Sequence, residues 1–288
     1  MLGGALSAAG WRTRQEAVRL ITNPMSTRNL PAKRPIDYGL VFDDVAITRP
    51  DGARLVAWYV PGTNGAVIIA LHGYKSHRGE MSNEAALLNR RGYGILQPAM
   101  RTHDMSDGDV ITFGRRELDD IQAWYDFVLA EPGVDRRRIG LLGNSLGGTL
   151  AIEFAARQPG VRAVAANSAF SSLRDTIDTS VRFFTGMPPF PFAPMIEFWA
   201  ERQAGITVDD VDAKAWIGRI SPRPVLLMQG GADVVIDKAS GQRLYDAAGE
   251  PKELWFDANV GHARFDTARP DEYERRVGQF FDTYLLHQ

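Results

Sequence analysis

The sequence of 288 residues contains no cysteine. Disulfide bonds, thiolate metal sites and a cysteine nucleophile are therefore excluded, and the composition agrees with a reducing compartment. On this basis we predict a cytoplasmic location. Peripheral association with a membrane and a truncated N-terminal anchor stay open as alternatives.

Strong basic character and long hydrophobic runs are also missing. The formal net charge is −2 and no long run of lysine and arginine occurs, so we expect no nucleic-acid partner. No stretch reaches about 18 uninterrupted apolar residues, so we expect no integral membrane span. The opening MLGGALSAAG lacks a cationic segment and soon meets Trp11, Arg12 and Arg14, which is not the pattern of a signal peptide.

What the chain does contain is a regular alternation of strand and helix patterns. Apolar residues make up 44% and charged residues 24%, the balance of a folded globular protein. Helical patterns such as 114–133, with Leu118, Ile121 and Trp124 on one stripe, lie between apolar runs with strand character. These runs are 66–73, 93–100, 138–145, 161–170, 224–233 and 252–258. Continuous apolar strands joined by helices predict an α/β fold with a parallel sheet covered on both faces.

Three segments depart from this alternation. Residues 11–21 have amphipathic spacing, so we expect an N-terminal arm over 1–35, a short helix plus a connector, before a main domain over 36–288. Two β-rich runs around an Asp-Gly turn predict a hairpin at the edge of the sheet. The connection from about 171 to 220 is too long for an ordinary crossover, so it predicts a small helical cap over the carboxyl ends of the strands.

Ser145 is the first candidate for chemistry. It lies in a G-x-S-x-G pattern, which alone is weak evidence because glycine-rich patterns arise by chance. Here the pattern follows a buried strand and opens a helix, the setting of a nucleophile elbow. Gly143 and Gly147 lack a Cβ, so strand and helix can close around a serine in a strained conformation. A structural serine in a tight turn is the alternative.

A serine hydroxyl reacts only with help from a base and an acid. Of the five histidines, His262 lies in the loop between the last strand-like run and the final helix, where it can reach back over the sheet. Asp233 ends an earlier strand, which gives the chain order Ser, Asp, His of this kind of elbow. Asp175 is a second candidate for the acid, with a helix-start role as its alternative. A helix cap for Asp233 and a surface loop for His262 also stay open.

Two backbone amides are candidates for stabilising the oxyanion. The N–H of Leu146 lies at the positive end of the helix that follows the serine, and the N–H of Tyr74 lies on the loop after the run 66–73. The phenol of Tyr74 either adds to this oxyanion hole or only packs. We expect His72 to shape the loop.

From Tyr38 to Gln288 the sequence resembles the α/β-hydrolase superfamily, on the motifs HGY, GNSLGG, GGADVVI and the late GH pair in family order. It is similar to compact bacterial carboxylesterases, lysophospholipase-like hydrolases and the catalytic domain of prolyl oligopeptidases. The resemblance implies an eight-stranded, mostly parallel sheet and a cofactor-free mechanism with Ser145, Asp233 and His262 as triad. Many relatives carry D-x-R-G-x-G-x-S where this chain has AMRTHDMS (99–106), so packing beside the oxyanion loop is expected to differ.

Aromatic residues of the predicted cap are candidates for a substrate pocket. They equally fit the core of the cap, and docking on a lipid surface is a third interpretation. The six are Phe183, Phe184, Phe190, Phe192, Phe198 and Trp199. Arg101 and Arg115 either recognise an acidic substrate group or form ordinary ion pairs.

Together these features predict a carboxylesterase that acts on a small-molecule ester through an acyl-enzyme. A peptidase or amidase, and a thioesterase, use the same side chains and stay open. A non-catalytic ligand-binding protein is a further alternative. No metal-ligand spacing such as H-E-x-x-H occurs, so we expect no metal and no cofactor. The sequence leaves the oligomeric state open.

Overall fold

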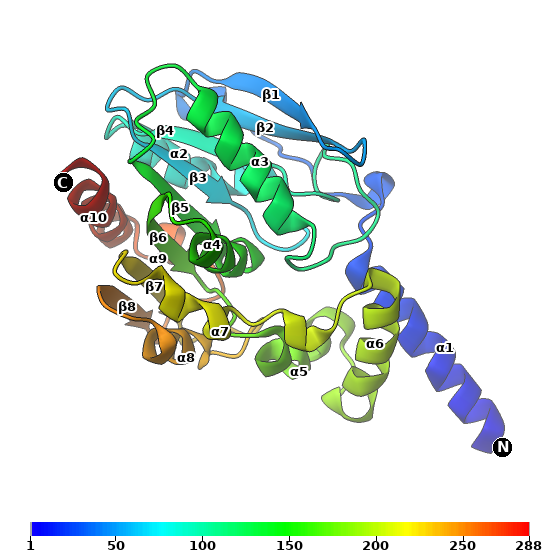
Figure 1. The fold of residues 1–288 in the computed structure, drawn as a ribbon. Helices are drawn as coiled ribbons and strands as arrows, with labels where there is room; N and C mark the ends of the chain where they lie inside the picture. The colour runs from blue at the N-terminus through cyan, green and yellow to red at the C-terminus, as the bar shows by residue number, and fades with distance from the viewer. Residues whose placement is uncertain (1, 288) are drawn as a thin grey trace.

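The computed structural model describes residues 2–287 and is built around one eight-stranded sheet (Figure 1). Its strand order is β1-β2-β4-β3-β5-β6-β7-β8. The pairs β1–β2 and β2–β4 are antiparallel, and the other neighbours are parallel, which confirms the predicted mostly parallel sheet with a hairpin at its edge. The strands are β1 Asp43–Thr48, β2 Arg54–Val60, β3 Val67–Leu71, β4 Gly94–Pro98, β5 Ile139–Asn144, β6 Val161–Asn167, β7 Val225–Gly230 and β8 Lys252–Asp257.

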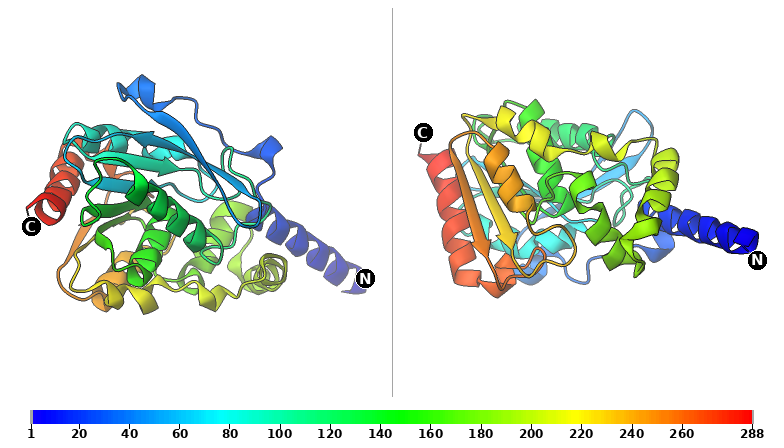
Figure 2. Two further views of the ribbon diagram at one scale, coloured as in Figure 1. Left: turned by 45° about the horizontal axis from the view of Figure 1, so that its top comes forward. Right: turned by 90° about the horizontal axis from the view of Figure 1, so that it is seen from below.

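Helices cover both faces of the sheet (Figures 1 and 2). In β3, Ile69 and Leu71 pack into the core on one face, whereas Ile68 and Ala70 pack into the core on the other. Because side chains alternate along a strand, burial on both faces makes each central strand apolar throughout. The helices of these two layers are α2 Ser82–Asn89, α3 Glu117–Ala130, α4 Leu146–Arg157, α7 Ala213–Ile217, α8 Ser240–Ala247, α9 Phe265–Ala268 and α10 Pro270–Phe281. Short 3₁₀ helices are η1 Met25–Thr27, η2 Pro35–Tyr38, η3 Arg78–Met81, η4 Val208–Asp210 and η5 Gly218–Ile220, and η6 Asp282–Leu286 is a π-helix.

The interval predicted as a cap, 171–220, contains two kinds of helix. Helices α5 (Leu173–Thr185) and α6 (Pro189–Ala204) pack together in a small hydrophobic cluster that includes Val181 and Ile196. The rest of the interval returns to the main body, because α7 packs on α4 and Ile217 lies in the core beside the sheet. We therefore use the name cap for α5 and α6 alone, because α7 packs with the helices beside the sheet.

The N-terminal helix α1 (Leu2–Ile21) is longer than the predicted 11–21 and projects from the body in every view (Figures 1 and 2). Residues 3–10 are mostly glycine, alanine and serine, which give no periodic pattern from which to predict a helix. The second half of α1 packs on α6, with Ala17 in the cap's hydrophobic cluster. Within the arm predicted over 1–35, the second half of the helix is thus packed against the cap. The ends of the two predicted segments, Met1 and Gln288, lie outside the described residues.

Within residues 2–287, no helix combines the length and the hydropathy that crossing a bilayer needs.

Candidate active site

Ser145 occupies a sharp turn between β5 and α4. Its φ of 54° and ψ of −120° lie outside the regions that non-glycine residues normally adopt. A Cβ on Gly147 would lie 2.2 Å from the carbonyl oxygen of Leu71, and one on Gly143 would lie 2.3 Å from the carbonyl oxygen of Gly147. Only glycine permits this contact of α4 with β5 and β3. The strained turn is therefore held from both sides, with Ser145 at the carboxyl edge of the sheet.

Ser145, His262 and Asp233 form one hydrogen-bonded line. The His262 Nε2 lies 2.8 Å from the Ser145 Oγ, and its Nδ1 lies 2.7 Å from the Asp233 Oδ2. The other carboxylate oxygen of Asp233 accepts the backbone N–H groups of Val235 and Ile236, at 2.8 and 3.1 Å. These two donors fix the carboxylate, so its remaining oxygen is aimed at the imidazole. The three residues that the sequence predicts as a triad are brought together.

Ser168 supports the histidine loop, a contact that the sequence analysis does not anticipate. Its Oγ accepts the N–H of Ala263, next to His262, at 3.0 Å. Ser168 directly follows β6 and has a φ of 51°, and Ala263 has a φ of 50°. The contact could have been expected from the position of Ser168 directly after β6, because the carboxyl ends of β6 and its parallel neighbours meet at the same edge of the sheet.

The two predicted oxyanion donors lie beside Ser145. Leu146 is the first residue of α4, so its N–H has no acceptor within the helix. The loop of Gly73 and Tyr74 runs close by, since a Cβ on Gly73 would lie 3.5 Å from the Ser145 Cβ. Among the described residues, no acceptor is recorded for the Tyr74 N–H, whereas its neighbours Gly73 and Lys75 donate to Glu80 and His103. Two amides are thus available next to the hydroxyl.

Two buried histidines hold the loop of Gly73 and Tyr74 in place. His72 Nε2 accepts the N–H of Met100 at 3.0 Å, and His103 Nε2 accepts the N–H of Lys75 at 2.9 Å. In both rings Nδ1 lies 2.8 Å from a backbone carbonyl, so Nδ1 carries the proton and each imidazole is neutral. Burial lowers the pKa of His72, and burial, with His72 nearby, lowers the pKa of His103 to about 3. Sequence analysis predicts the loop-shaping role of His72 but misses His103.

The phenol of Tyr74 is bound to the N-terminal helix. Its hydroxyl donates to the carbonyl oxygen of Leu20, and its ring lies 6.0 Å from that of Phe113 and 5.2 Å from that of Phe184. Burial raises the pKa of the Tyr74 hydroxyl well above its ordinary value. Of the two predicted alternatives, the structure favours packing, because the hydroxyl is committed to α1.

Ser145 opens into an apolar cavity of about 110 Å³ beneath the cap. Its surface is almost entirely apolar and comes from the sheet edge, α5, α6 and the end of α1. Representative lining residues are Leu20, Leu146, Phe170, Ile177, Phe184 and Ile196. A second, wider pocket of about 500 Å³ also reaches Ser145, and its lining adds His262, Glu80 and Arg264. The serine thus lies between a small, almost entirely apolar cavity and a larger, more polar pocket.

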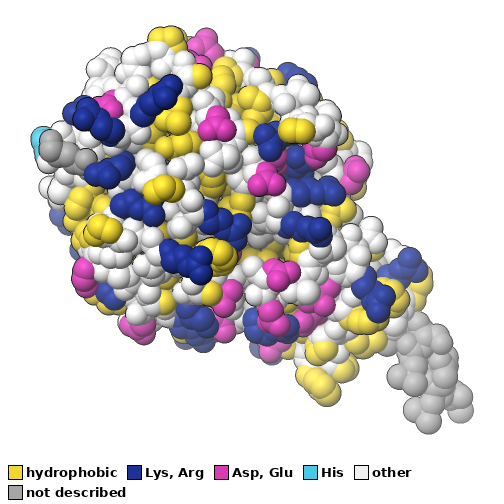
Figure 3. Space-filling model, viewed as in Figure 1, with side chains coloured by type: hydrophobic (Ala, Val, Ile, Leu, Met, Phe, Trp, Pro, Cys, Tyr) yellow, Lys and Arg dark blue, Asp and Glu magenta, His cyan; other side chains and the backbone are white. Residues whose placement is uncertain are grey.

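The six candidate pocket aromatics separate into three pairs. Phe184 lines both cavities and Phe183 lines the wider one. Phe192 and Trp199 pack against the hydrophobic cluster of the cap. Phe190 and Phe198 are 83% and 47% exposed. Figure 3 shows hydrophobic side chains gathered at the end of the molecule where α1 leaves the body.

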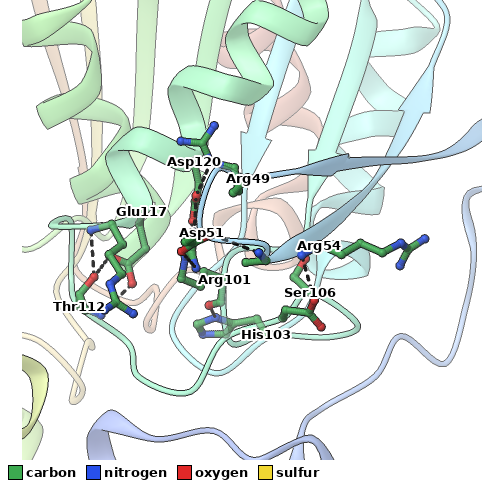
Figure 4. Close-up of polar contacts among 12 residues, drawn as sticks. Arg49, Asp51, Arg54, Arg101, His103, Ser106, Thr112, Glu117 and Asp120 are labelled. Atoms are coloured by element: carbon green, nitrogen blue, oxygen red, sulfur yellow. Dashed lines mark hydrogen bonds and ion pairs between the residues drawn. The ribbon is translucent and has the colours of Figure 1, made fainter.

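The other charged candidates already have partners. Arg101 binds Asp120 at 2.8 and 2.9 Å and Asp51 at 2.8 Å (Figure 4). Arg115 donates to the carbonyl oxygen of Gly205. Asp175 lies in the first turn of α5, accepts the hydroxyl of Ser171 at 2.8 Å, and pairs with Lys214 at 3.4 Å. Asp175 is therefore a helix-start residue, and neither arginine is a free ligand for a substrate.

The sequence AMRTHDMS keeps the loop shape that glycine favours. Thr102 and Asp104 stand where many relatives have glycine, and both have positive φ, at 69° and 50°. Ser106 donates to the carbonyl oxygen of Ala99 at 2.8 Å and accepts the N–H of Val56 at 3.0 Å. This segment thus differs from the pattern of many relatives in its residue types, while its backbone keeps the positive φ angles that glycine would adopt at positions 102 and 104.

A buried carboxyl lies beneath the elbow. Glu84 is 1% exposed, and its Oε1 accepts the side-chain amide of Asn144, the residue before Ser145, at 3.3 Å. Burial raises the pKa of Glu84 to about 8, so this carboxyl is largely protonated at neutral pH. Within residues 2–287, no group of three or more histidine, aspartate or glutamate side chains is arranged to hold a metal ion.

Comparison with known proteins agrees with this architecture. Residues 62–196 match the family model described as serine aminopeptidase, S33. The uncharacterized protein YfhR of Escherichia coli K12 is 27% identical over 258 residues, covering 85% of this chain and 82% of YfhR. The structure of the Pyrococcus furiosus esterase Pf2001 matches with a TM-score of 0.75 and 26% identity, over 92% of this chain and 98% of that one. The α/β hydrolase GrgF from Penicillium sp. sh18 shares the fold, with a TM-score of 0.69 at 19% identity over 85% and 99% of the two chains.

The chain belongs to the α/β-hydrolase superfamily.

Proposed function

We propose that the protein is a carboxylic ester hydrolase that uses Ser145 as nucleophile, His262 as base and Asp233 as the residue that orients it. The observation that carries this proposal is the hydrogen-bonded line of 2.8 and 2.7 Å through the imidazole of His262. A hydroxyl in this arrangement can lose its proton to the imidazole as it attacks a carbonyl carbon. The name of Pf2001 as an esterase supports the choice of substrate.

The reaction proceeds in two halves. His262 Nε2 takes the Ser145 proton as Oγ attacks the ester carbonyl, and the negative oxygen is held by the N–H groups of Tyr74 and Leu146. Each such donor stabilises the transition state by about 3 kcal/mol. The tetrahedral species collapses, and the leaving alcohol takes the proton from His262. A water molecule, deprotonated by His262, then attacks the acyl-enzyme in the same way, and the acid is released with Ser145 restored.

The apolar cavity favours an ester over an N-terminal peptide. An aminopeptidase binds a free ammonium group in the acyl part of its substrate, and a buried ammonium needs an ionic partner. In the part of the chain that the structure describes, Glu197 is the one acidic residue that lines this cavity, and Arg174 already binds its carboxylate at 2.6 and 2.8 Å. The cavity therefore offers no unpaired carboxylate, although the matched family model is named for aminopeptidases.

A substrate panel tests the proposal. Purified protein is assayed with p-nitrophenyl esters of graded acyl length, acyl thioesters and aminoacyl anilides, and Ser145→Ala serves as the matched control. We expect kcat/KM to be highest for an ester, and a fluorophosphonate probe to add its mass to the wild type but not to Ser145→Ala. Higher kcat/KM for the anilides would overturn the ester assignment. An unlabelled wild-type serine without turnover would argue for a ligand-binding protein.

A further inference from the structure

The end of the N-terminal helix forms part of the cavity beside Ser145. Leu20 and Ile21 line this cavity together with Phe184 of α5 and Ile196 of α6. Ile21 is 3% exposed, and Leu20 is half-buried against the hydrophobic cluster of the cap. A segment far from the serine in sequence thus closes the space next to it.

Hydrogen bonds fix this end of α1 to the oxyanion loop and to the cap. The last carbonyl groups of a helix lack intrahelical partners, and here the side chains of Tyr74 and Lys75 donate to the carbonyl oxygens of Leu20 and Arg19. The guanidinium of Arg19 donates to the carbonyl oxygen of Phe184 at 2.7 Å. The wall is therefore held at a defined distance from the reacting serine.

The position of His262 decides which part of an ester enters which pocket. His262 gives its proton to the leaving oxygen, so the leaving group must lie on the side of Ser145 where the imidazole is. The wider pocket is lined by His262 and its neighbours Gly261 and Arg264, whereas the apolar cavity has none of them in its lining. The leaving group then occupies the wider pocket, and the acyl group enters the apolar cavity.

We infer that α1 is a specificity element of this active site: Leu20 and Ile21 form the wall that limits the acyl group of the substrate. This inference rests on the proposed function, because it assigns the acyl part of an ester to the cavity. The preferred substrates carry an apolar acyl chain, since the cavity surface is almost entirely apolar. Burying one additional methylene changes binding by about fourfold. A change in the wall should therefore alter how kcat/KM depends on the length of the acyl chain.

Two opposite substitutions at one position test the wall. Leu20→Ala enlarges the cavity and Leu20→Trp fills it, while Leu30→Ala makes the same truncation at a residue of the arm that is 52% exposed and outside the cavity lining. The measured quantity is the ratio of kcat/KM for each p-nitrophenyl ester to that for the acetate. We expect Leu20→Ala to raise this ratio about fourfold or more for chains beyond the wild-type optimum, Leu20→Trp to lower it by a similar factor, and Leu30→Ala to leave it unchanged.

A binding measurement separates this inference from the proposed function. In a Ser145→Ala background, the dissociation constants of n-alkanoates from acetate to dodecanoate are measured by calorimetry, with and without Leu20→Ala. Tighter binding of the longer chains in the double variant supports the wall even if the wild type hydrolyses no ester. Unchanged chain-length profiles in both assays, from variants with wild-type circular dichroism, would overturn it. Ile21→Ala is the second variant if Leu20→Ala does not fold.

Discussion

Two parts of this molecule meet at Ser145 and are built differently. The first part, which we call the catalytic edge because it carries the three residues of the proposed mechanism, belongs to the sheet. Ser145, Asp233 and His262 each follow a strand of this sheet. The opposing wall is a separate unit of α1, α5 and α6, whose small cluster contains five buried residues, among them Ala17 and Val181. Backbone pairing positions the first part, whereas side-chain packing and a few hydrogen bonds, such as those made by the side chains of Tyr74 and Arg19, position the second. We therefore expect substitutions in the first to change rate or folding, and those in the second to change selectivity.

Ser145→Ala gives the largest expected effect on the catalytic edge. Removal of the hydroxyl leaves no group to form the acyl-enzyme, so kcat should fall by about 10⁵-fold or more. The fold should persist, since alanine fits the same turn and keeps the Cβ. Turnover of a p-nitrophenyl ester checks the fall in kcat, and the thermal midpoint checks that the fold persists. A variant with more than a hundredth of wild-type activity would remove Ser145 from its role.

Much of this catalytic edge is predictable from the sequence, because its signals are local or topological. The motif around Ser145 fixes a strand, a turn and a helix in one short stretch, and Asp233 and His262 follow strands whose carboxyl ends share one edge. The supporting role of His103 is not predicted by the sequence. Its partner is the backbone N–H of Lys75 across a different loop, and no spacing rule marks such a contact.

The unit formed by α1, α5 and α6 is much harder to predict from the sequence. The interval 171–220 is visibly too long for a crossover, but helix periodicity does not say which helix joins the sheet, and α7 does. The pairing of α1 with α6 joins segments more than 150 residues apart through generic apolar contacts. For the same reason the aromatic stretch does not reveal that Phe184 lines the cavity while Phe190 is exposed.

Gly147→Ala tests whether backbone contact positions the catalytic edge. The new Cβ would lie 2.2 Å from the Leu71 carbonyl oxygen, so α4 or β3 must move. We expect the free energy of unfolding to fall by about 3 kcal/mol. The matched control is Gly10→Ala in α1, where a Cβ meets nothing within 4 Å and helix propensity favours alanine by up to about 1 kcal/mol. Equal effects on the urea midpoint would contradict the comparison.

His103→Gln tests the catalytic edge through the pH dependence of the unfolding free energy. The folded protein keeps His103 neutral down to about pH 3, whereas in the unfolded chain a histidine binds a proton below about pH 6.5. Between these values the unfolded state binds more protons, so stability contributed by His103 is complete above pH 6.5 and decreases as pH falls, by up to about 1.4 kcal/mol per pH unit.

Glutamine at position 103 does not titrate, so the difference in unfolding free energy between wild type and His103→Gln reports His103 and its effect on the neighbouring His72, and distant groups such as Glu84 cancel. We expect the advantage of the wild type to shrink steadily from pH 6.5 to pH 4 in urea titrations. A difference that stays constant with pH would mean that His103 is not kept neutral by burial.

Phe190→Ala has the smallest expected effect. It changes a residue of the cap that lies outside both pockets at Ser145. The ring is 83% exposed and outside the linings of both cavities at Ser145. Exposed side chains of this kind contribute within about 0.5 kcal/mol of zero to stability, so the thermal midpoint and kcat/KM for a water-soluble ester should stay at wild-type values. Phe184→Ala, the same change on a ring that lines both cavities, should alter KM. If the two variants behaved alike, the cap would act on the substrate through its whole surface, and the division between a catalytic edge and a selective wall would fail.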